Sequence, residues 1–178
     1  TNVYNAKTSA EKITVNATTT PKLYALATAD VIGGTAVGLT LSEVKIEDDV
    51  TVNVGDGVVL NADDTIDILA EFKNPEAGYN AYVEAIAGSG GVITGAVTST
   101  KIDLHTNTLT QLGKNIQING KTVDVKAVHK DTNNYYNLSA EASGASGKGS
   151  ESFSTVESDV DLSIDDGTTI TSSETTVI

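Results

Sequence analysis

The feature that most constrains the fold of this chain is a stretch that recurs. Residues 55–68, GDGVVLNADDTIDI, return as residues 113–125, GKNIQINGKTVDV, and a weaker copy, DDGTTITSSETTVI, ends the sequence at residues 165–178. In each copy, polar turn residues precede and divide two short runs in which Val, Ile or Thr alternates with other residues. Such alternation is typical of β-strands with one buried face, and Gly, Asn and Asp are typical of turns. The stretch therefore predicts a repeated strand–turn–strand unit.

The remaining segments repeat with the same period. Ile13, Ile66 and Val123 align at spacings of 53 and 57 residues. Each copy continues into an Ala-rich strand, at residues 23–29, 81–87 and 137–143, then a Gly-rich corner and a longer alternating run. Alternate alanines indicate a face pressed closely against a neighbour. In the first long run we expect Val37, Leu39 and Leu41 to face inward, and the change of phase before Val44 indicates a β-bulge at Ser42–Glu43.

A period in the fifties indicates a solenoid or an array of small domains. The two-residue alternation excludes helical repeats, and about 55 residues is short for a sandwich domain with its own core. We therefore predict an all-β parallel β-helix, in which each repeat forms two to three coils, giving a rod on the order of 40 Å long. The predicted solenoid is one continuous domain with these parts: 1–10, the end of a preceding repeat; 11–63, 64–120 and 121–173, three repeats; and 174–178, the start of a truncated fourth.

Charge and composition exclude several classes of partner. The formal net charge is −13, and all 11 basic residues are lysines, so nucleic acid and anionic membranes are poor partners. Without cysteine the chain has neither disulfides nor thiolate metal ligands. The sequence contains no apolar run of about 18 residues, so we predict no membrane insertion. The sequence opens at Thr1, from which we expect a piece of a longer protein.

Two stretches carry a resemblance to a known family. VGDGVVLNADDTIDILA at residues 54–70 and TSTKIDLHTNTLTQLGKNIQINGKTVDVKA at 98–127 resemble the repeats of leukotoxin-type filamentous adhesins, which are exported by Gram-negative bacteria as autotransporters or two-partner-secreted proteins. The resemblance implies a right-handed parallel β-helix, built here from ~53–57-residue repeats, and an extracellular or bacterial cell-surface location. Its motifs are strands and corners, so it identifies no receptor-binding residue.

Catalytic and metal-binding readings are weaker. Asp67, Asp124 and Lys126 lie on one expected outer line, as in polysaccharide-active β-helices, but a full repeat, about 10 to 15 Å, would separate the two carboxylates. We therefore predict no catalytic residues, and leave a polysaccharide-active enzyme as the least favoured alternative. Acidic pairs at predicted corners leave calcium as an alternative to simple solvation; these are Asp48–Asp49, Asp63–Asp64 and Asp165–Asp166.

The histidines and threonines can be explained without a metal site or a binding surface. His105 and His129 lack the spacing of a zinc site and are expected in solvated loops. We predict no metal and no cofactor. Threonine runs at 18–20, 98–100 and 106–110 would bind a regular surface such as ice, carbohydrate or mineral only if they formed outward ladders; strand propensity explains them equally well.

Tyrosines give the binding prediction. Tyr24 and Tyr82 align between repeats and are expected to stack, whereas Tyr79, Tyr135 and Tyr136 are expected on variable loops, where exposed tyrosines are suited to contact a ligand. The expected contact loops are residues 19–22, 72–80 and 130–136, and the expected partner is a protein or glycan receptor on a host cell or another bacterium.

The sequence thus predicts a β-helical stalk or spacer of a filamentous adhesin that also contacts receptors through its loops. The alternative is a dedicated receptor- or carbohydrate-binding module. Open strand edges at both ends of the stack also predict end-to-end self-association.

Overall fold

A computed structural model describes residues 1–130, 135–143 and 148–178, and every regular element in them is a β-strand. In the described residues no helix is present that is long and apolar enough to cross a membrane. The strands are β1 (Asn2–Val3), β2 (Lys7–Thr19), β3 (Leu23–Ile32), β4 (Thr35–Val54), β5 (Val59–Phe72), β6 (Ala81–Gly90), β7 (Ile93–Leu112), β8 (Gln117–His129), β9 (Tyr135–Ser143), β10 (Lys148–Ile164) and β11 (Thr169–Val177). The predicted all-β class is confirmed.

The strands form three sheets in which all pairs are parallel. Their orders are β1-β4-β7-β10, β11-β8-β5-β2 and β3-β6-β9. Ile13 pairs with Ile66 and Ile66 with Val123, so residues aligned in the sequence are neighbours on adjacent strands. This arrangement is compatible with a β-helix.

The expectation of two to three coils per repeat is wrong. Equivalent strands pair directly, which means that the chain passes through each sheet once before its next copy begins. At the usual parallel spacing of about 4.8 Å, a four-stranded sheet is only about 15 Å deep along the stacking direction, not 40 Å. The length of the molecule lies instead within each layer.

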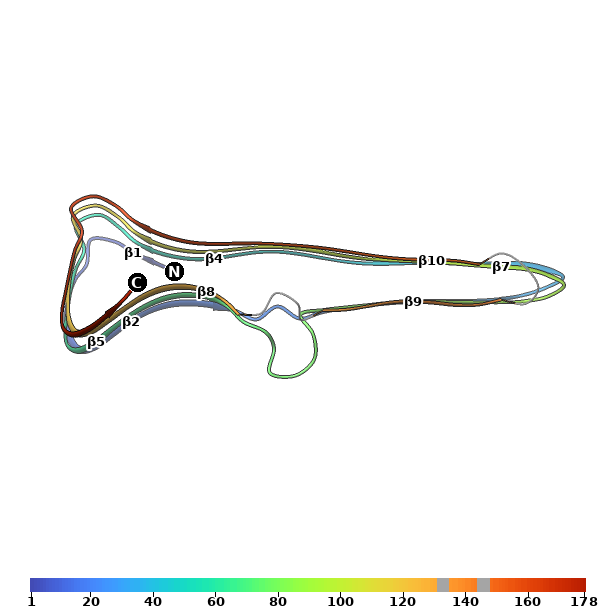
Figure 1. Cartoon of the computed structure of the whole chain (residues 1–178), viewed down its shortest axis with the longest axis horizontal. Coiled ribbons are helices and arrows are strands. Elements are labelled where there is room, and N and C mark those ends of the chain that lie inside the picture. Colours follow the sequence, from blue (N-terminus) through green and yellow to red (C-terminus); the bar gives the residue numbers. More distant parts are fainter. Residues whose placement is uncertain (131–134, 144–147) are drawn as a thin grey trace.

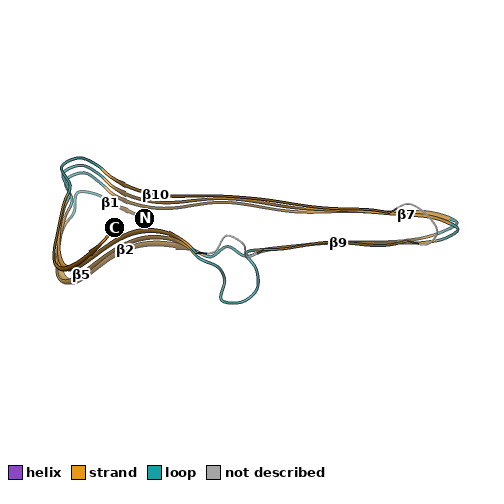
Figure 2. Ribbon diagram, viewed as in Figure 1, coloured by secondary structure: helices purple, strands orange, loops and turns teal. Residues whose placement is uncertain are grey.

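Each layer has a wide end and a narrow arm (Figure 1). At the wide end, the chain turns between the four-stranded sheets; in the arm, the sheet containing β4, β7 and β10 runs opposite β3, β6 and β9. Loops occur mainly at the corners, at the tip of the arm and in residues 73–80, which project from the side (Figure 2).

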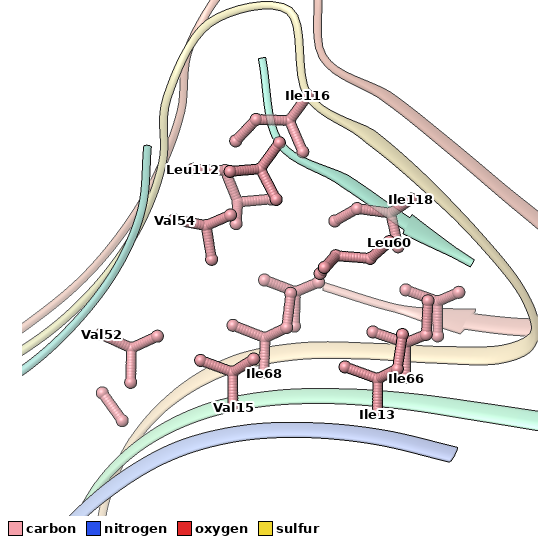
Figure 3. Close-up of a cluster of buried hydrophobic side chains, with 14 of the residues drawn as sticks. Ile13, Val15, Val52, Val54, Leu60, Ile66, Ile68, Leu112, Ile116 and Ile118 are labelled. Atoms are coloured by element: carbon pink, nitrogen blue, oxygen red, sulfur yellow. The ribbon is translucent and has the colours of Figure 1, made fainter. Parts of the chain in front are cut away.

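The main core fills the wide end with Val, Ile and Leu. Figure 3 shows Ile13 and Val15 stacked under Ile66 and Ile68, facing Leu60 and Ile118 across the interior. Ile66, Ile68 and Ile118 are fully buried. Repetition of the same apolar positions in successive strands therefore produces a continuous core.

Three turns at the corner of the wide end adopt the same unusual backbone conformation. Gly57, Asn115 and Gly167 have φ angles of 68°, 56° and 77°. Gly and Asn tolerate this left-handed region best, which explains GDG, GKN and DDG in the recurring stretch. The predicted turns are confirmed here.

The arm is thin because its interior side chains are small. Ala81, Ala85 and Ala87 of β6 are fully buried against the opposite sheet, as the alternating alanines predicted. A Cβ added to Gly38 would lie 2.9 Å from the carbonyl oxygen of Gly88, so the two backbones approach too closely for a larger residue. Side-chain size thus sets the distance between the sheets.

The expected inward face of β4 is wrong in the arm. Val37, Leu39 and Leu41 point outward and are 65%, 59% and 68% exposed, whereas Thr40 and Ser42 are buried. β4 pairs with β7 without any register shift, so the bulge predicted at Ser42–Glu43 is absent. Buried and exposed side chains alternate along this part of β4 without interruption. The apolar residues change from the outer to the inner face near Ser42–Glu43, where the interior widens.

The threonine runs of β7 also face inward. Thr98, Thr100, Thr106, Thr108 and Thr110 are all at most 5% exposed. Most of their hydroxyls have partners inside: Thr110 donates to the Lys126 carbonyl at 2.7 Å, and Thr98 bonds Ser139. Thr108 Oγ1 is buried without a hydrogen-bond partner among the described residues. These threonines cannot form the outward surface-binding ladder that was considered for them.

Candidate functional site

The site with the strongest binding character is a cluster of tyrosines on the outer face of β3, β6 and β9. Tyr24, Tyr82 and Tyr136 occupy paired positions on these strands. The ring centroids of Tyr24 and Tyr82 are 4.8 Å apart, those of Tyr82 and Tyr136 4.6 Å, with interplanar angles of 22° and 14°. Parallel pairing thus builds a stack of three aromatic rings.

Tyr79 joins the stack from the loop at residues 73–80. Its ring centroid lies 6.0 Å from that of Tyr82 and 5.6 Å from that of Tyr136, in tilted orientations. Tyr24 is 62% exposed and Tyr79 38%. We call Tyr24, Tyr79, Tyr82 and Tyr136 the tyrosine cluster. It offers ring edges and hydroxyls to a partner, the amphipathic chemistry that suits tyrosine to interfaces.

One hydroxyl of the cluster is held by a carboxylate. The Tyr82 hydroxyl donates to Glu84 Oε2 at 2.8 Å. That hydrogen bond, together with burial, raises the pKa of Tyr82 to about 12, because the carboxylate stabilises the protonated phenol. Tyr82 therefore remains a neutral donor at physiological pH.

The loop carrying Tyr79 is anchored to the preceding layer. Asn80, which is only 2% exposed, donates from Nδ2 to the Pro21 carbonyl at 2.9 Å. Lys22 Nζ donates to the Ala77 carbonyl at 3.2 Å. Gly78 has a φ of 86°, the left-handed conformation that favours glycine. These contacts fix the loop beside the stacked rings.

The predicted binding residues lie in different kinds of element. Tyr79 lies in its loop beside the stack, but Tyr136 lies in β9, in register with Tyr82, rather than in a loop. Tyr135 begins β9, and its side chain lies outside the described residues, as do residues 131–134 of the third contact loop. Aligning YY at 135–136 with LY at 23–24 and AY at 81–82 would have identified the third ring of the stack.

The predicted separation of Asp67 and Asp124 is wrong. The two residues pair on adjacent strands, β5 and β8, a spacing of about 4.8 Å rather than 10 to 15 Å. Lys126 Nζ is 3.1 Å from Asp124 Oδ2, on the half-exposed outer face. The distance between Asp67 and Asp124 is therefore no argument against a pair of catalytic carboxylates. The partner that the structure shows for Asp124 is Lys126.

The acidic pairs and histidines lie apart from the tyrosine cluster. Asp48 accepts a hydrogen bond from Thr19 Oγ1 at 2.7 Å. In the part of the chain that the structure describes, no group of three or more His, Cys, Asp or Glu side chains could hold a metal ion. His105 and His129 both lie in strands, β7 and β8, and not in the loops expected for them.

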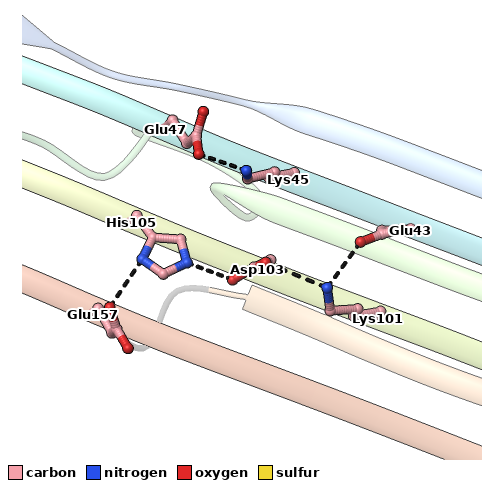
Figure 4. Close-up of polar contacts among 7 residues, drawn as sticks. All are labelled: Glu43, Lys45, Glu47, Lys101, Asp103, His105 and Glu157. Carbon is pink, nitrogen blue, oxygen red and sulfur yellow. Dashed lines mark hydrogen bonds and ion pairs between the residues drawn. The ribbon is translucent and has the colours of Figure 1, made fainter.

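Sequence reasoning did not anticipate the polar ladder on the outer face of β4, β7 and β10. His105 Nε2 is 2.7 Å from Asp103 Oδ1, and its Nδ1 is 3.0 Å from Glu157 Oε2 (Figure 4). Lys101 bridges Glu43 at 3.0 Å and Asp103 at 3.3 Å. The signal was the alternation of charged residues in each long run, which becomes a lattice only when the strands are aligned.

Comparison with known proteins leaves the site to be interpreted from its geometry. No family model, no curated protein and no solved structure matches this chain.

Proposed function

We propose that this chain is a segment of an extracellular or surface-bound bacterial filamentous adhesin, in which it acts as a stalk or spacer. In this proposal the three parallel sheets form a right-handed β-solenoid of ~53–57-residue repeats. The supporting observation is the parallel register that joins each long strand to its equivalent in the next copy: Val44 to Ile102, and Val156 to Leu104.

Such pairing suits a spacer for a physical reason. A parallel layer leaves backbone donors and acceptors at its edge, and the next repeat satisfies them by the same pairing. Because Ile13, Ile66 and Val123 occupy equivalent core positions, an added repeat also extends the core. Length then grows by about 4.8 Å per layer without any new kind of contact.

The tyrosine cluster supports a second candidate, a receptor- or carbohydrate-binding module. Four aromatic rings gather where an anchored loop meets the sheet, and Tyr24 is largely exposed. Partially exposed tyrosines, rigid and amphipathic, are common binding anchors for protein and sugar partners. The spacer remains our first proposal because repeated pairing involves the whole chain, whereas the cluster involves one face.

Adhesion of the purified chain distinguishes the two. We would measure its binding to host cells and to partner bacteria, beside variants in which residues 73–80 are replaced by a Gly–Ser linker or Tyr24 by Ser. Tyr4→Ser is the matched control, since Tyr4 is 58% exposed but lies at the wide end. A spacer predicts no saturable binding by any form. Saturable binding that only Tyr24→Ser and the loop replacement abolish would reject the spacer in favour of the binding module.

A further inference from the structure

The outer face of β4, β7 and β10 is divided into two halves of opposite character. Toward the tip of the arm lies an apolar stripe, which we define as Val37, Leu39, Leu41, Val97 and Phe153; their exposures range from 43% to 68%. Toward the wide end lies an acidic ladder, which we define as Glu47, Asp49, Glu157, Asp159 and Asp161. Both halves lie on the same strands, so one partner can cover them together.

Glycines lie beside part of the apolar stripe and leave it open. Val37 pairs with Gly95, and Leu39 pairs with Val97, which in turn pairs with Gly149. Adjacent exposed apolar residues of this kind mark interaction sites, unlike apolar residues scattered singly over a surface. Leu41 and Phe153 also line a hollow of ≈ 360 Å³ with Glu43, Ser99 and Lys101. This hollow offers a receptacle for an apolar side chain, with charged groups at its rim.

The acidic ladder carries more negative charge than the cations beside it compensate. Across the strands, Glu47 pairs with His105 and His105 with Glu157; Asp49 pairs with Asn107 and Asn107 with Asp159.

The nearby lysines are already engaged. Lys45 binds Glu47 at 2.5 Å, and Lys101 binds Glu43 and Asp103 (Figure 4). Among the described residues, Asp49, Asp159 and Asp161 form no ion pair. Carboxylates held about 5 to 10 Å apart on a flat sheet attract positive charge.

We propose that this face binds a protein segment with apolar side chains at one end and Lys or Arg side chains at the other, about 20 Å apart. The spacing follows from the six-residue step from Leu41 to Glu47 at about 3.3 Å per residue. Charge complementarity selects a basic segment, because the ladder would repel acidic peptides and anionic lipid headgroups. The proposal rests on this face alone and not on the stalk or on the tyrosine cluster.

The test uses the whole 178-residue chain, isotopically labelled, and a synthetic extended peptide. The peptide carries three valines at alternate positions and, starting six residues after the last valine, three lysines at alternate positions. We expect saturable changes in amide NMR signals confined to β4, β7 and β10, and weaker binding at high salt because exposed charges are screened. Leu41→Ser should weaken binding by about tenfold through lost apolar contact, and Asp159→Asn by about two- to fivefold through lost charge.

Matched controls lie elsewhere on the surface. Leu26, 49% exposed on β3 at the opposite side of the arm, and exposed Asp64 supply Leu26→Ser and Asp64→Asn, which should leave binding unchanged. A peptide with Glu in place of Lys should not bind. Equal binding of the Glu peptide, or indifference to Leu41→Ser and Asp159→Asn, would overturn the proposal. Concentration-dependent self-association that Leu41→Ser abolishes would also overturn it, since the occupant would then be a second copy of the chain.

Discussion

His129, at the end of β8, sits where the wide end narrows into the arm. Its ring stacks on Phe72, with centroids 4.3 Å apart and an interplanar angle of 15°. Nδ1 lies 3.3 Å from Thr106 Oγ1, whereas Nε2 is buried without a hydrogen-bond partner among the described residues. Burial disfavours the charged imidazolium and lowers the pKa of His129 below its usual 6.5.

This burial predicts a loss of stability in mild acid. The unfolded chain takes up a proton on His129 at a higher pH than the folded chain does, so the free energy of unfolding falls as pH drops from about 6.5 through the folded pKa. His129→Phe keeps an aromatic ring against Phe72 but cannot be protonated. Urea unfolding at pH values from 8 to 5 should therefore show less pH dependence in this variant than in the parent chain.

The carboxylate of Glu71 also titrates, but its effect on stability falls below the pH range used to test His129. Burial alone would raise the pKa of Glu71, but Lys73 at 2.8 Å and Lys130 at 2.9 Å outweigh burial and lower it below 4.5. The stability that Glu71 contributes is present above pH 4.5 and is lost only as pH falls through its folded pKa. A pH profile between 8 and 5 that is identical in the parent and His129→Phe chains would contradict the assignment to His129.

At the scale of the element, the side chains that β4 buries change along its length from large and apolar to small or polar. Its inward positions hold Val52 and Ile46 near the wide end, then Ser42 and Thr40, then Ala36 near the tip. Side-chain volume therefore declines as the opposing sheet approaches. Leu39 and Leu41 of β4 face solvent because the interior of the arm beside them has room only for side chains no larger than threonine.

Two alanine substitutions in β4 test this orientation. Ile46, 4% exposed, belongs to a buried cluster with Val83 and Leu104, so Ile46→Ala should cost about 2–5 kcal/mol of unfolding free energy. Leu41, 68% exposed, should cost no more than about 0.5 kcal/mol. Equilibrium denaturation of both variants measures the difference. Equal losses, or a larger loss for Leu41→Ala, would place β4 in the opposite phase.

At the scale of the molecule, each sheet ends in strands that pair on one side only. The outermost strands include β2 and β3 in one direction and β9, β10 and β11 in the other. Their unpaired backbone groups form a template for another parallel strand, and repeated side-chain positions supply a matching core.

We therefore expect the isolated chain to associate end to end. Sedimentation velocity over a range of concentrations should show growing species. Leu41→Ser should leave them unchanged, because strand pairing uses backbone groups and the Leu41 side chain points out of the sheet. A chain that stays monomeric at all concentrations would contradict this expectation. Loss of association in Leu41→Ser would instead assign it to the face.

The sequence by itself determined the strands, the turns and their pairing partners. Alternation predicts strands, Gly and Asn mark the turns with positive φ, and the recurrence of Ile13 in Ile66 and Val123 identifies residues that become neighbours. These properties are local or repeat with the chain, so an alignment of the sequence with itself contains them.

Only the tertiary structure decided which face of each long strand is inside and how many layers a repeat makes. A run such as VGLTL alternates identically whichever face is buried; the distance between the arm's two sheets, set by Gly38, Gly88 and the buried alanines, selects Thr40 and Ser42 for the interior. The same packing brings Tyr136 onto Tyr82 and aligns the acidic ladder. These outcomes depend on contacts between segments more than 50 residues apart, which local periodicity does not encode.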